Sequence, residues 1–181
     1  MIGSVLNIKP LLWGDPTGHI VALQKCRGRK KAIDAIVELY RLEARDTILV
    51  ISNSGRNAVP VEMCLAAKAK GAKVIAMTSL QHSQNCTSRH SSGKKMYEIA
   101  DVTIDNWGEP GDAAFPIEGL DTPIGPTSSL TGITIAQALV CQVVDNLVKA
   151  GLEPPVFKSS NSDGGDTPTP TPDPTPGPDE G

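Results

Sequence analysis

Aromatic side chains are scarce in this sequence and make up only 3% of its 181 residues. The predicted core therefore consists mainly of aliphatic, Ala and Met side chains. The four cysteines form no Cys-x-x-Cys pair, and none of the three histidines lies at ligand spacing from them. This pattern argues against a zinc site or a disulfide framework. We therefore predict no metal, no other cofactor, and thiols that stay reduced in the cytoplasm.

A marked excess of positive charge is also lacking. The formal net charge is −3, and five of the acidic residues follow residue 158, where no basic residue occurs. The remaining body has 15 acidic and 17 basic residues, which predicts no nucleic-acid binding. The chain also lacks the basic start of a signal peptide and the run of about 18 apolar residues that a membrane helix needs. These absences predict a cytoplasmic protein with no membrane association.

The first 45 residues have the pattern of a β-hairpin followed by a helix. Ile8 to Trp13 and Ile20 to Lys25 are short apolar runs, and the residues between them are turn formers. From Arg27 to Ala44, apolar residues recur on one helical face. We expect this unit to be integrated into the same sheet as the strands that follow.

Residues 46–158 alternate between apolar β-branched runs and helical patterns. The fold class predicted is α/β: a Rossmann-like core with three parallel strands and helices on its faces, extended by the N-terminal hairpin and helix. The expected strands are 47–52, 73–77 and 102–104, the first two buried on both faces, and the expected helices are 58–70 and 94–99.

The C-terminal third is predicted to hold a long loop, a long helix and a tail. Residues 107–126 are rich in Gly, Pro and acids and read as a loop. Thr127 or Ser128 caps a helix that continues to Lys149. Residues 159–181 contain Thr-Pro repeats and few apolar side chains, so we expect a disordered acidic tail.

The segment Ser52-Asn53-Ser54-Gly55-Arg56-Asn57 carries the clearest chemical signal. It joins a predicted strand to a predicted helix. The free N–H groups and positive dipole of a helix start suit a phosphate group, serine hydroxyls add donors, and glycine lets the backbone approach a ligand closely. A plain helix-capping turn explains the same spacing equally well.

Residues 47–166 resemble the SIS (sugar isomerase) domain family. The matching segments are ILVISNSGRNAVPVEM, KVIAMTSLQHS, SRHSSGKKMYEIADVTIDN, GPTSSLTG and GLEPPVFKSSNSDGGD. The resemblance implies a phosphosugar-binding Rossmann-like domain that acts as an isomerase, lyase or sensor. It also implies that the family's Ser-x-Ser-Gly loop holds the sugar phosphate. The ligand-binding residues implied by position are Ser52, Asn53, Ser54, Gly55, Asn57, Thr78, Ser79, Thr127 and Ser128.

The N-terminal part departs from that family pattern. Related proteins begin with about two βα units that include a Gly-x-Gly-His-Ser loop, which supplies part of the sugar site and does not occur here. Residues 5–43 instead resemble part of the second domain of DegV-like fatty-acid-binding proteins, through LNIKPLL and KCRGRKKAIDAI. This suggests a composite chain, natural or engineered, joined near Ala44-Arg45-Asp46.

Catalytic residues are harder to identify from the sequence. Aldose–ketose isomerisation needs a base beside a carbonyl and an acid for its oxygen. Glu118 in the long loop is the best carboxylate, Asp112 is a weaker rival, and His90 or Lys94 in a second polar loop is a candidate proton carrier. The competing interpretation is that Glu118 and His90 belong to ordinary solvated loops.

Two kinds of function follow from these patterns. The first is phosphosugar binding, with isomerase activity if the site is completed. The resemblance implies that a second copy in a homodimer can complete it, since SIS domains commonly pair. The second is a DegV-like lipid-binding module, which predicts a closed apolar cavity. An inactive recombination product is the third alternative.

Overall fold

The computed structural model describes residues 7–14, 20–39, 41–154, 156, 159 and 161–163. The chain divides into two compact units, residues 1–133 and 134–181. The division falls inside helix α5 (Ser128–Lys149). The domain boundaries expected near residues 45 and 158 stay predictions. Most of the tail predicted to be disordered, residues 159–181, lies outside the described residues.

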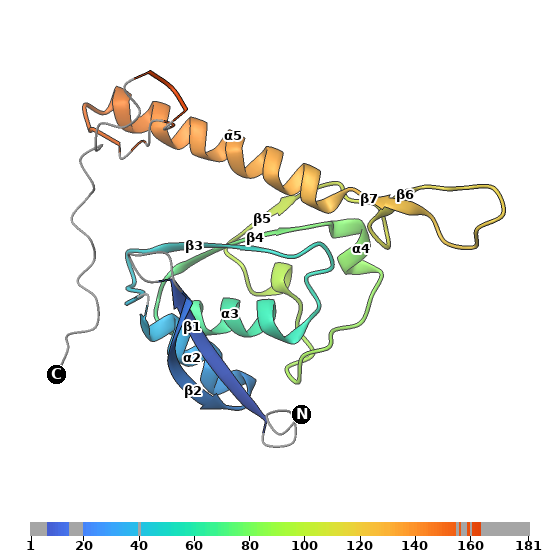
Figure 1. The fold of residues 1–181 in the computed structure, drawn as a ribbon, viewed down its shortest axis with the longest axis horizontal. Helices are drawn as coiled ribbons and strands as arrows, with labels where there is room; N and C mark the ends of the chain where they lie inside the picture. Colours follow the sequence, from blue (N-terminus) through green and yellow to red (C-terminus); the bar gives the residue numbers. More distant parts are fainter. Residues whose placement is uncertain are drawn as a thin grey trace. The chain divides into compact units, whose positions relative to one another are not determined.

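A parallel three-stranded sheet forms the centre of the first unit (Figure 1). Its strands are β3 (Thr47–Ile51), β4 (Lys73–Thr78) and β5 (Val102–Asp105), in the order β3-β4-β5. Both strand pairs are parallel, and helix α3 (Ala58–Ala69) connects β3 to β4. The α/β, Rossmann-like fold class predicted from the alternating pattern is therefore confirmed.

The main hydrophobic core lies between this sheet and α3. Alternate residues of β4 point toward the helix, and Val74 and Ala76 are fully buried there. Helix α3 contributes small and β-branched side chains. They recur every three residues and therefore lie on the one helical face that contacts the sheet. The buried residues of this cluster are Val61, Cys64, Ala67, Ala72, Val74, Ala76 and Met96.

The opposite face of β3 differs from its prediction. A strand buried on both faces was expected, but Leu49 and Ile51 are 37% and 50% exposed. On this face of the sheet, within the first unit, Gly132 lies close to the side chains of Ile51 and Met77 at the ends of their strands. Helix α3 covers only the other face, so apolar composition alone overestimated the burial of β3.

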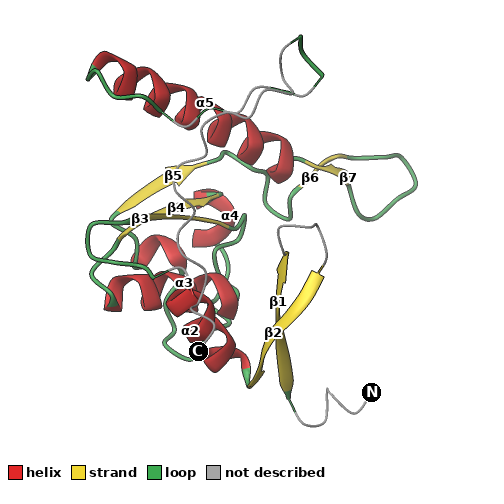
Figure 2. Ribbon diagram, turned by 60° about the vertical axis from the view of Figure 1, so that its left-hand side comes forward, coloured by secondary structure: helices red, strands yellow, loops and turns green. Residues whose placement is uncertain are grey.

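The N-terminal hairpin and helix pack as an extra layer on α3 (Figure 2). Strands β1 (Ile8–Gly14) and β2 (Ile20–Arg27) pair antiparallel, and α2 (Arg29–Leu39) contacts both β2 and α3. Among the described residues these strands form a two-stranded sheet of their own. The prediction that they extend the parallel sheet is therefore wrong, because α2 and α3 lie between the hairpin and that sheet.

The segment after β5 holds more structure than the predicted loop. Strands β6 (Ala113–Phe115) and β7 (Ile124–Pro126) form a short antiparallel pair. The ring of Phe115 packs against Gly125 so closely that a Cβ at that position would overlap it. The Gly- and Pro-rich composition of this segment predicted a loop. The strand pair forms because of cross-strand packing, which local propensity does not show.

Two short helical segments complete the first unit. Helix α4 (Leu80–Gln84) was not predicted, and the hydroxyl of Ser79 caps it by accepting a hydrogen bond from His82 N. The helix predicted over 94–99 is reduced to the 3-10 turn η1 (Met96–Glu98). Both segments are too short to show a helical period in the sequence.

Helix α5 is the longest helix in the described part of the chain. By length and composition it is the one described helix that is apolar enough to cross a membrane, with a mean hydropathy of 1.3 over its best window. The sequence predicted no such stretch, because polar residues such as Thr134, Gln137 and Gln142 interrupt the apolar run. Core helices of soluble proteins pass the same test.

Candidate functional site

The loop at residues 52–57 turns sharply where β3 ends. Ser52 N–H donates to the Met77 carbonyl at 3.0 Å, and Gly55 N–H donates back to the Ser52 carbonyl at 3.1 Å. Gly55 is buried and has a positive φ of 56°. A Cβ there would lie 3.0 Å from Thr78 Oγ1 and 3.3 Å from Ser83 Oγ. The glycine is thus required both by its backbone conformation and by close neighbours.

Asn53 anchors this loop to the ends of the neighbouring strands. Its carbonyl accepts hydrogen bonds from Thr78 Oγ1 at 2.8 Å and from Ser79 N–H at 2.9 Å. Its side-chain oxygen accepts from Asn106 Nδ2 at 3.2 Å, and Asn106 is only 3% exposed. Both oxygens of Asn53 are therefore bound within the protein, which supports a positioning role.

Ser52 and Ser54 keep hydroxyl groups that can bind a ligand. Neither hydroxyl has a hydrogen-bond partner among the described residues, and both side chains are partly exposed. The N-terminus of α3 follows directly, with Asn57 as its cap residue and no side-chain capping bond. The N–H groups of Ala58 and Val59, ahead of Pro60, are therefore open to an anion, with the favourable end of the dipole of this 12-residue helix behind them.

Thr78 and Ser79 lie beside the loop but are fully buried. Thr78 uses its hydroxyl to hold Asn53, as above. Ser79 Oγ donates to the Gly108 carbonyl at 2.6 Å and accepts from His82 N–H. The described hydrogen bonds of both side chains are to other protein groups. In this structure these two predicted ligand residues therefore hold the loop in position.

The segment from Cys86 to Met96 braces the other side of the loop. Met96 N–H donates to the Gly55 carbonyl at 2.9 Å, and Arg89 N–H donates to the Arg56 carbonyl at 2.8 Å. Arg89 also reaches Asn57 Oδ1, at 3.4 Å. Arg56 Nη2 lies 3.5 Å from Thr87 Oγ1, while its Nε is buried without a partner. Two guanidinium groups thus raise the positive potential at the start of α3.

His90 is held inside the same segment. Its Nε2 lies 2.8 Å from Glu62 Oε1 on α3, and its Nδ1 lies 2.7 Å from Ser92 Oγ. The hydrogen bond from His90, more than the neighbouring Lys30, lowers the pKa of Glu62 below its ordinary value of 4.5. His90 is therefore not a simple solvated loop residue, although no described contact joins its ring to Ser52 or Ser54.

The other predicted catalytic residue, Glu118, is placed differently. It is exposed in the connection between β6 and β7, and no described contact brings it to the 52–57 loop. The structure therefore gives no geometric support to Glu118 as the base.

Thr127 and Ser128, at the start of α5, already have an anionic partner. The carboxylate of Asp112 accepts from Ser128 N–H and from Ser128 Oγ, both at 2.8 Å, and from Thr127 N–H at 3.2 Å. Asp112 adopts a positive φ of 75°, a conformation that is uncommon outside glycine. The polar groups predicted to face the ligand are thus used to cap the helix.

Sequence reasoning missed the two residues that organise this region, Asn106 and Asp112. Asn106 follows a predicted strand, as Ser52 and Thr78 do, and the carboxyl ends of parallel strands share one edge of a sheet. That position was the available signal for Asn106. Asp112 was weighed only as a base, because its partners lie 15 and 16 residues away across a hairpin that the sequence did not reveal.

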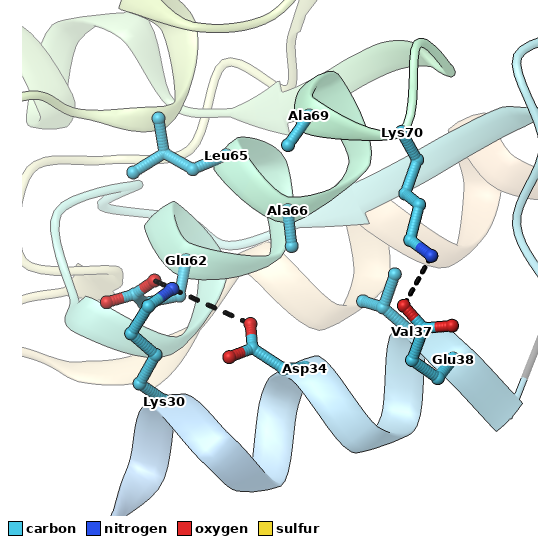
Figure 3. A pocket seen from close by; sticks show the side chains of 9 residues that line it. All are labelled: Lys30, Asp34, Val37, Glu38, Glu62, Leu65, Ala66, Ala69 and Lys70. Carbon is cyan, nitrogen blue, oxygen red and sulfur yellow. Dashed lines mark ion pairs between the residues drawn. The ribbon is translucent and has the colours of Figure 1, made fainter.

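A cleft of about 280 Å³ lies between α2 and α3 (Figure 3). Charged side chains cross its mouth: Lys30 pairs with Asp34 and Glu62 at 3.6 and 3.7 Å, and Lys70 pairs with Glu38. The apolar part of its wall is Val37, Leu65, Ala66 and Ala69. Ion pairs at the rim do not match the closed apolar cavity that a lipid-binding module requires.

Comparison with known proteins agrees with this architecture. The SIS domain family matches residues 4–79. A UPF0309 protein of a Geobacillus strain is 42% identical over 171 residues, which are 91% of this chain and 67% of that protein. The chain belongs to the UPF0309 family. A UPF0309 protein of Halalkalibacterium halodurans is 51% identical over 144 residues, and one of Listeria monocytogenes is 40% identical over 149 residues.

The match to the Halalkalibacterium halodurans protein covers 80% of this chain and 58% of that protein. The chain therefore spans somewhat more than half the length of this relative.

The comparisons give no support to a DegV-like segment or to a composite chain. The SIS match begins at residue 4 and extends past residues 44–46, where the composite interpretation placed a junction. The hairpin, α2 and the parallel sheet also belong to one compact unit. The unusual N-terminal segment is therefore part of the region that matches the SIS domain.

Proposed function

We propose that the loop at residues 52–57 binds the phosphate group of a sugar phosphate. The observation that carries this proposal is the pair of hydroxyls of Ser52 and Ser54, without protein partners among the described residues, beside the open N-terminus of α3. A phosphate dianion would accept hydrogen bonds from these groups and gain from the helix dipole. The match to the SIS domain supports the same ligand class.

We assign different tasks to the predicted ligand residues. Ser52, Ser54 and the backbone after Gly55 form the phosphate contacts, and Arg56 adds positive charge. Asn53 holds the loop in place through Thr78, Ser79 and Asn106. Binding is therefore expected to depend on the two serines directly and on the other residues through the shape of the loop.

Isothermal titration calorimetry with a panel of hexose and amino-sugar phosphates tests this proposal. We expect one or more sugar phosphates to bind, the matching unphosphorylated sugars to bind much more weakly, and a Ser52→Ala, Ser54→Ala double variant to lose binding by at least about tenfold. Ser91→Ala is the matched control, because Ser91 is exposed in the neighbouring segment. Equal affinity in the double variant and the wild type would contradict the proposal.

We further propose sugar-phosphate isomerisation as the reaction if the site is completed. His90 has a carboxylate partner and a shielded ring, which suits a proton carrier. An assay for aldose–ketose conversion of each sugar phosphate that binds would test this step. Binding without conversion would leave the phosphate site intact and exclude the isomerase.

A second copy of the chain is our proposed partner, and the cytoplasm our proposed location. Support for a dimer comes from the apolar side chains of Leu49, Ile51 and Val102, which the sheet leaves partly exposed in the first unit. Light scattering coupled to size exclusion would give the mass in solution. A monomer at all concentrations tested would contradict the dimer but not phosphate binding.

A further inference from the structure

Three side chains outside the phosphate loop form a continuous hydrogen-bonded chain. Ser92 Oγ lies 2.7 Å from His90 Nδ1, and His90 Nε2 lies 2.8 Å from Glu62 Oε1. The serine and histidine belong to the segment between α4 and η1, and the glutamate belongs to α3. A hydroxyl, an imidazole and a carboxylate in this order are the parts that activate a nucleophile.

The backbone fixes which ring nitrogen of His90 carries the proton. Ser92 N–H donates to Nδ1 at 3.1 Å, so Nδ1 must present a lone pair. The proton of the neutral ring then lies on Nε2 and is donated to Glu62. The Ser92 hydroxyl consequently donates to Nδ1, which is the orientation needed for its proton to be removed.

The burial of the three groups differs in a way that suits this chemistry. The imidazole is 7% exposed and the Glu62 side chain 18% exposed, whereas Ser92 is exposed to solvent. The base is thus sheltered behind a hydroxyl that reagents can reach. The pKa of Glu62 is lowered by its hydrogen bond to His90, so the carboxylate stays charged behind the ring near neutral pH.

Local hydrogen bonds hold the segment in this shape. Ser88 Oγ donates to the Lys94 carbonyl at 2.7 Å and accepts from His90 N–H at 3.0 Å. Lys94 N–H donates to Ser92 Oγ at 3.2 Å. These hydrogen bonds lie on both sides of His90 and Ser92 in the sequence. The positions of the two residues therefore do not depend on one flexible side chain.

We propose that Ser92 is an activated serine that captures acyl or phosphonyl electrophiles covalently. Ser92 Oγ attacks the carbonyl carbon or phosphorus, an oxygen–carbon or oxygen–phosphorus bond forms, and the bond to the leaving group breaks. The serine proton moves to His90 Nδ1, and Glu62 stabilises the resulting imidazolium. The leaving group departs with the bonding electron pair, and His90 then returns its proton to solvent. This chemistry is independent of phosphate binding at residues 52–57.

The capture is stoichiometric rather than catalytic. Rapid turnover of an acyl enzyme needs backbone donors aimed at the developing oxyanion. The N–H of Ser92 is bound to His90 Nδ1, and the N–H of Gly93 donates to the His90 carbonyl at 3.0 Å. Once Nδ1 is protonated it no longer accepts from Ser92 N–H, so of these two groups only Ser92 N–H could turn toward a tetrahedral intermediate. One backbone donor in place of a pair gives slow turnover, and the adduct should persist.

Labelling the full chain with a reporter-bearing fluorophosphonate tests this proposal. The phosphorus–fluorine bond breaks and fluoride leaves, and intact mass and peptide mass spectrometry give the stoichiometry and the site. We expect one adduct, on Ser92, formed about 100-fold faster in the native protein than in urea. Ser92→Ala should abolish the adduct. Ser91→Ala, which alters the adjacent exposed serine, should leave it unchanged.

Two further variants test the roles of the partners, with folding checked by circular dichroism. His90→Gln should slow labelling by about 100-fold. Glu62→Gln keeps an oxygen beside Nε2 without its charge and should give an intermediate rate; a wild-type rate would make Glu62 only a support for the segment. The absence of an adduct, equal labelling of Ser91 and Ser92, or unchanged labelling in a folded His90→Gln variant would overturn the proposal.

Discussion

At the scale of single residues, Gly55 has the most constrained position in the candidate site. Its backbone is left-handed, and its neighbours Thr78 and Ser83 leave no space for a Cβ. The carbonyl of Gly55 also accepts a hydrogen bond from Met96 N–H. A single substitution here would therefore displace the loop, the segment that holds it and the backbone that faces the proposed phosphate.

Gly55→Ala is expected to lower the free energy of unfolding by about 2 kcal/mol or more, from left-handed strain and close contact together. Gly93→Ala is the matched control, because Gly93 also has a positive φ, of 73°, but has open space around its Cα. We expect the control to cost only about 1 kcal/mol. Urea unfolding of both variants measures the difference, and equal losses would show that the neighbours of Gly55 yield without cost.

Glu62 gives a second prediction at this scale. Its pKa is lowered in the folded protein from the ordinary value of 4.5, so its stabilising contribution is present above that pH. The contribution is lost as the pH falls below 4.5 through the folded pKa. The difference in unfolding free energy between wild type and Glu62→Gln should therefore be on the order of 1 kcal/mol at pH 7 and shrink toward pH 3. A difference that stays constant over this range would contradict the prediction.

At the scale of elements, α3 connects the parallel sheet to the N-terminal helix α2 and to the turn η1. One face buries the core against β3 and β4, while another packs on α2. Its N-terminus forms one wall of the candidate phosphate site, and its residue Glu62 holds His90. The helix therefore couples the stability of the core to the position of both polar sites.

Two valines of α3 separate core packing from surface position. Val61 is fully buried, whereas Val59 is 48% exposed. Val61→Ala should lower the free energy of unfolding by about 2 kcal/mol through lost burial and a cavity. Val59→Ala should change it by less than about 0.5 kcal/mol. Chemical denaturation measures both values, and similar effects of the two variants would mean that α3 is rotated relative to its position here.

At the scale of the whole molecule, stability is distributed unevenly. Strand β4 lies between two partners and is buried along most of its length. Strands β6 and β7 form a two-stranded pair of three residues each, and much of it is exposed. A two-stranded pair without a buried face is marginally stable in water.

Hydrogen exchange followed by mass spectrometry should reveal this difference. We expect the amides of β4 to exchange at rates set by global unfolding, and those of β6 and β7 to exchange at least about 100-fold faster through local opening. The same order should hold at two protein concentrations if it arises within one chain. Equal protection of β4 and the β6–β7 pair would contradict this distribution.

The order of elements could be predicted from the sequence because local patterns carry it. Alternating strand and helix patterns gave the parallel sheet, and Gly71 ended α3 as expected, with a positive φ of 82°. The Ser-Asn-Ser-Gly loop was found for the same reason: its strand, glycine and helix start are contiguous. These features depend on residues that are close together in the sequence, so they can be predicted without the tertiary structure.

Partners that are distant in sequence were decided only by the tertiary structure. Asn106 holds Asn53 across 53 positions, and Glu62 holds His90 across 28. Asp112 accepts a hydrogen bond from the Ser128 hydroxyl, and the two residues are brought together by a hairpin that local propensity did not indicate. The sequence thus determined where the 52–57 loop would form. Only the folded chain decided which of its polar groups remain free, because hydrogen bonds between distant segments commit the others.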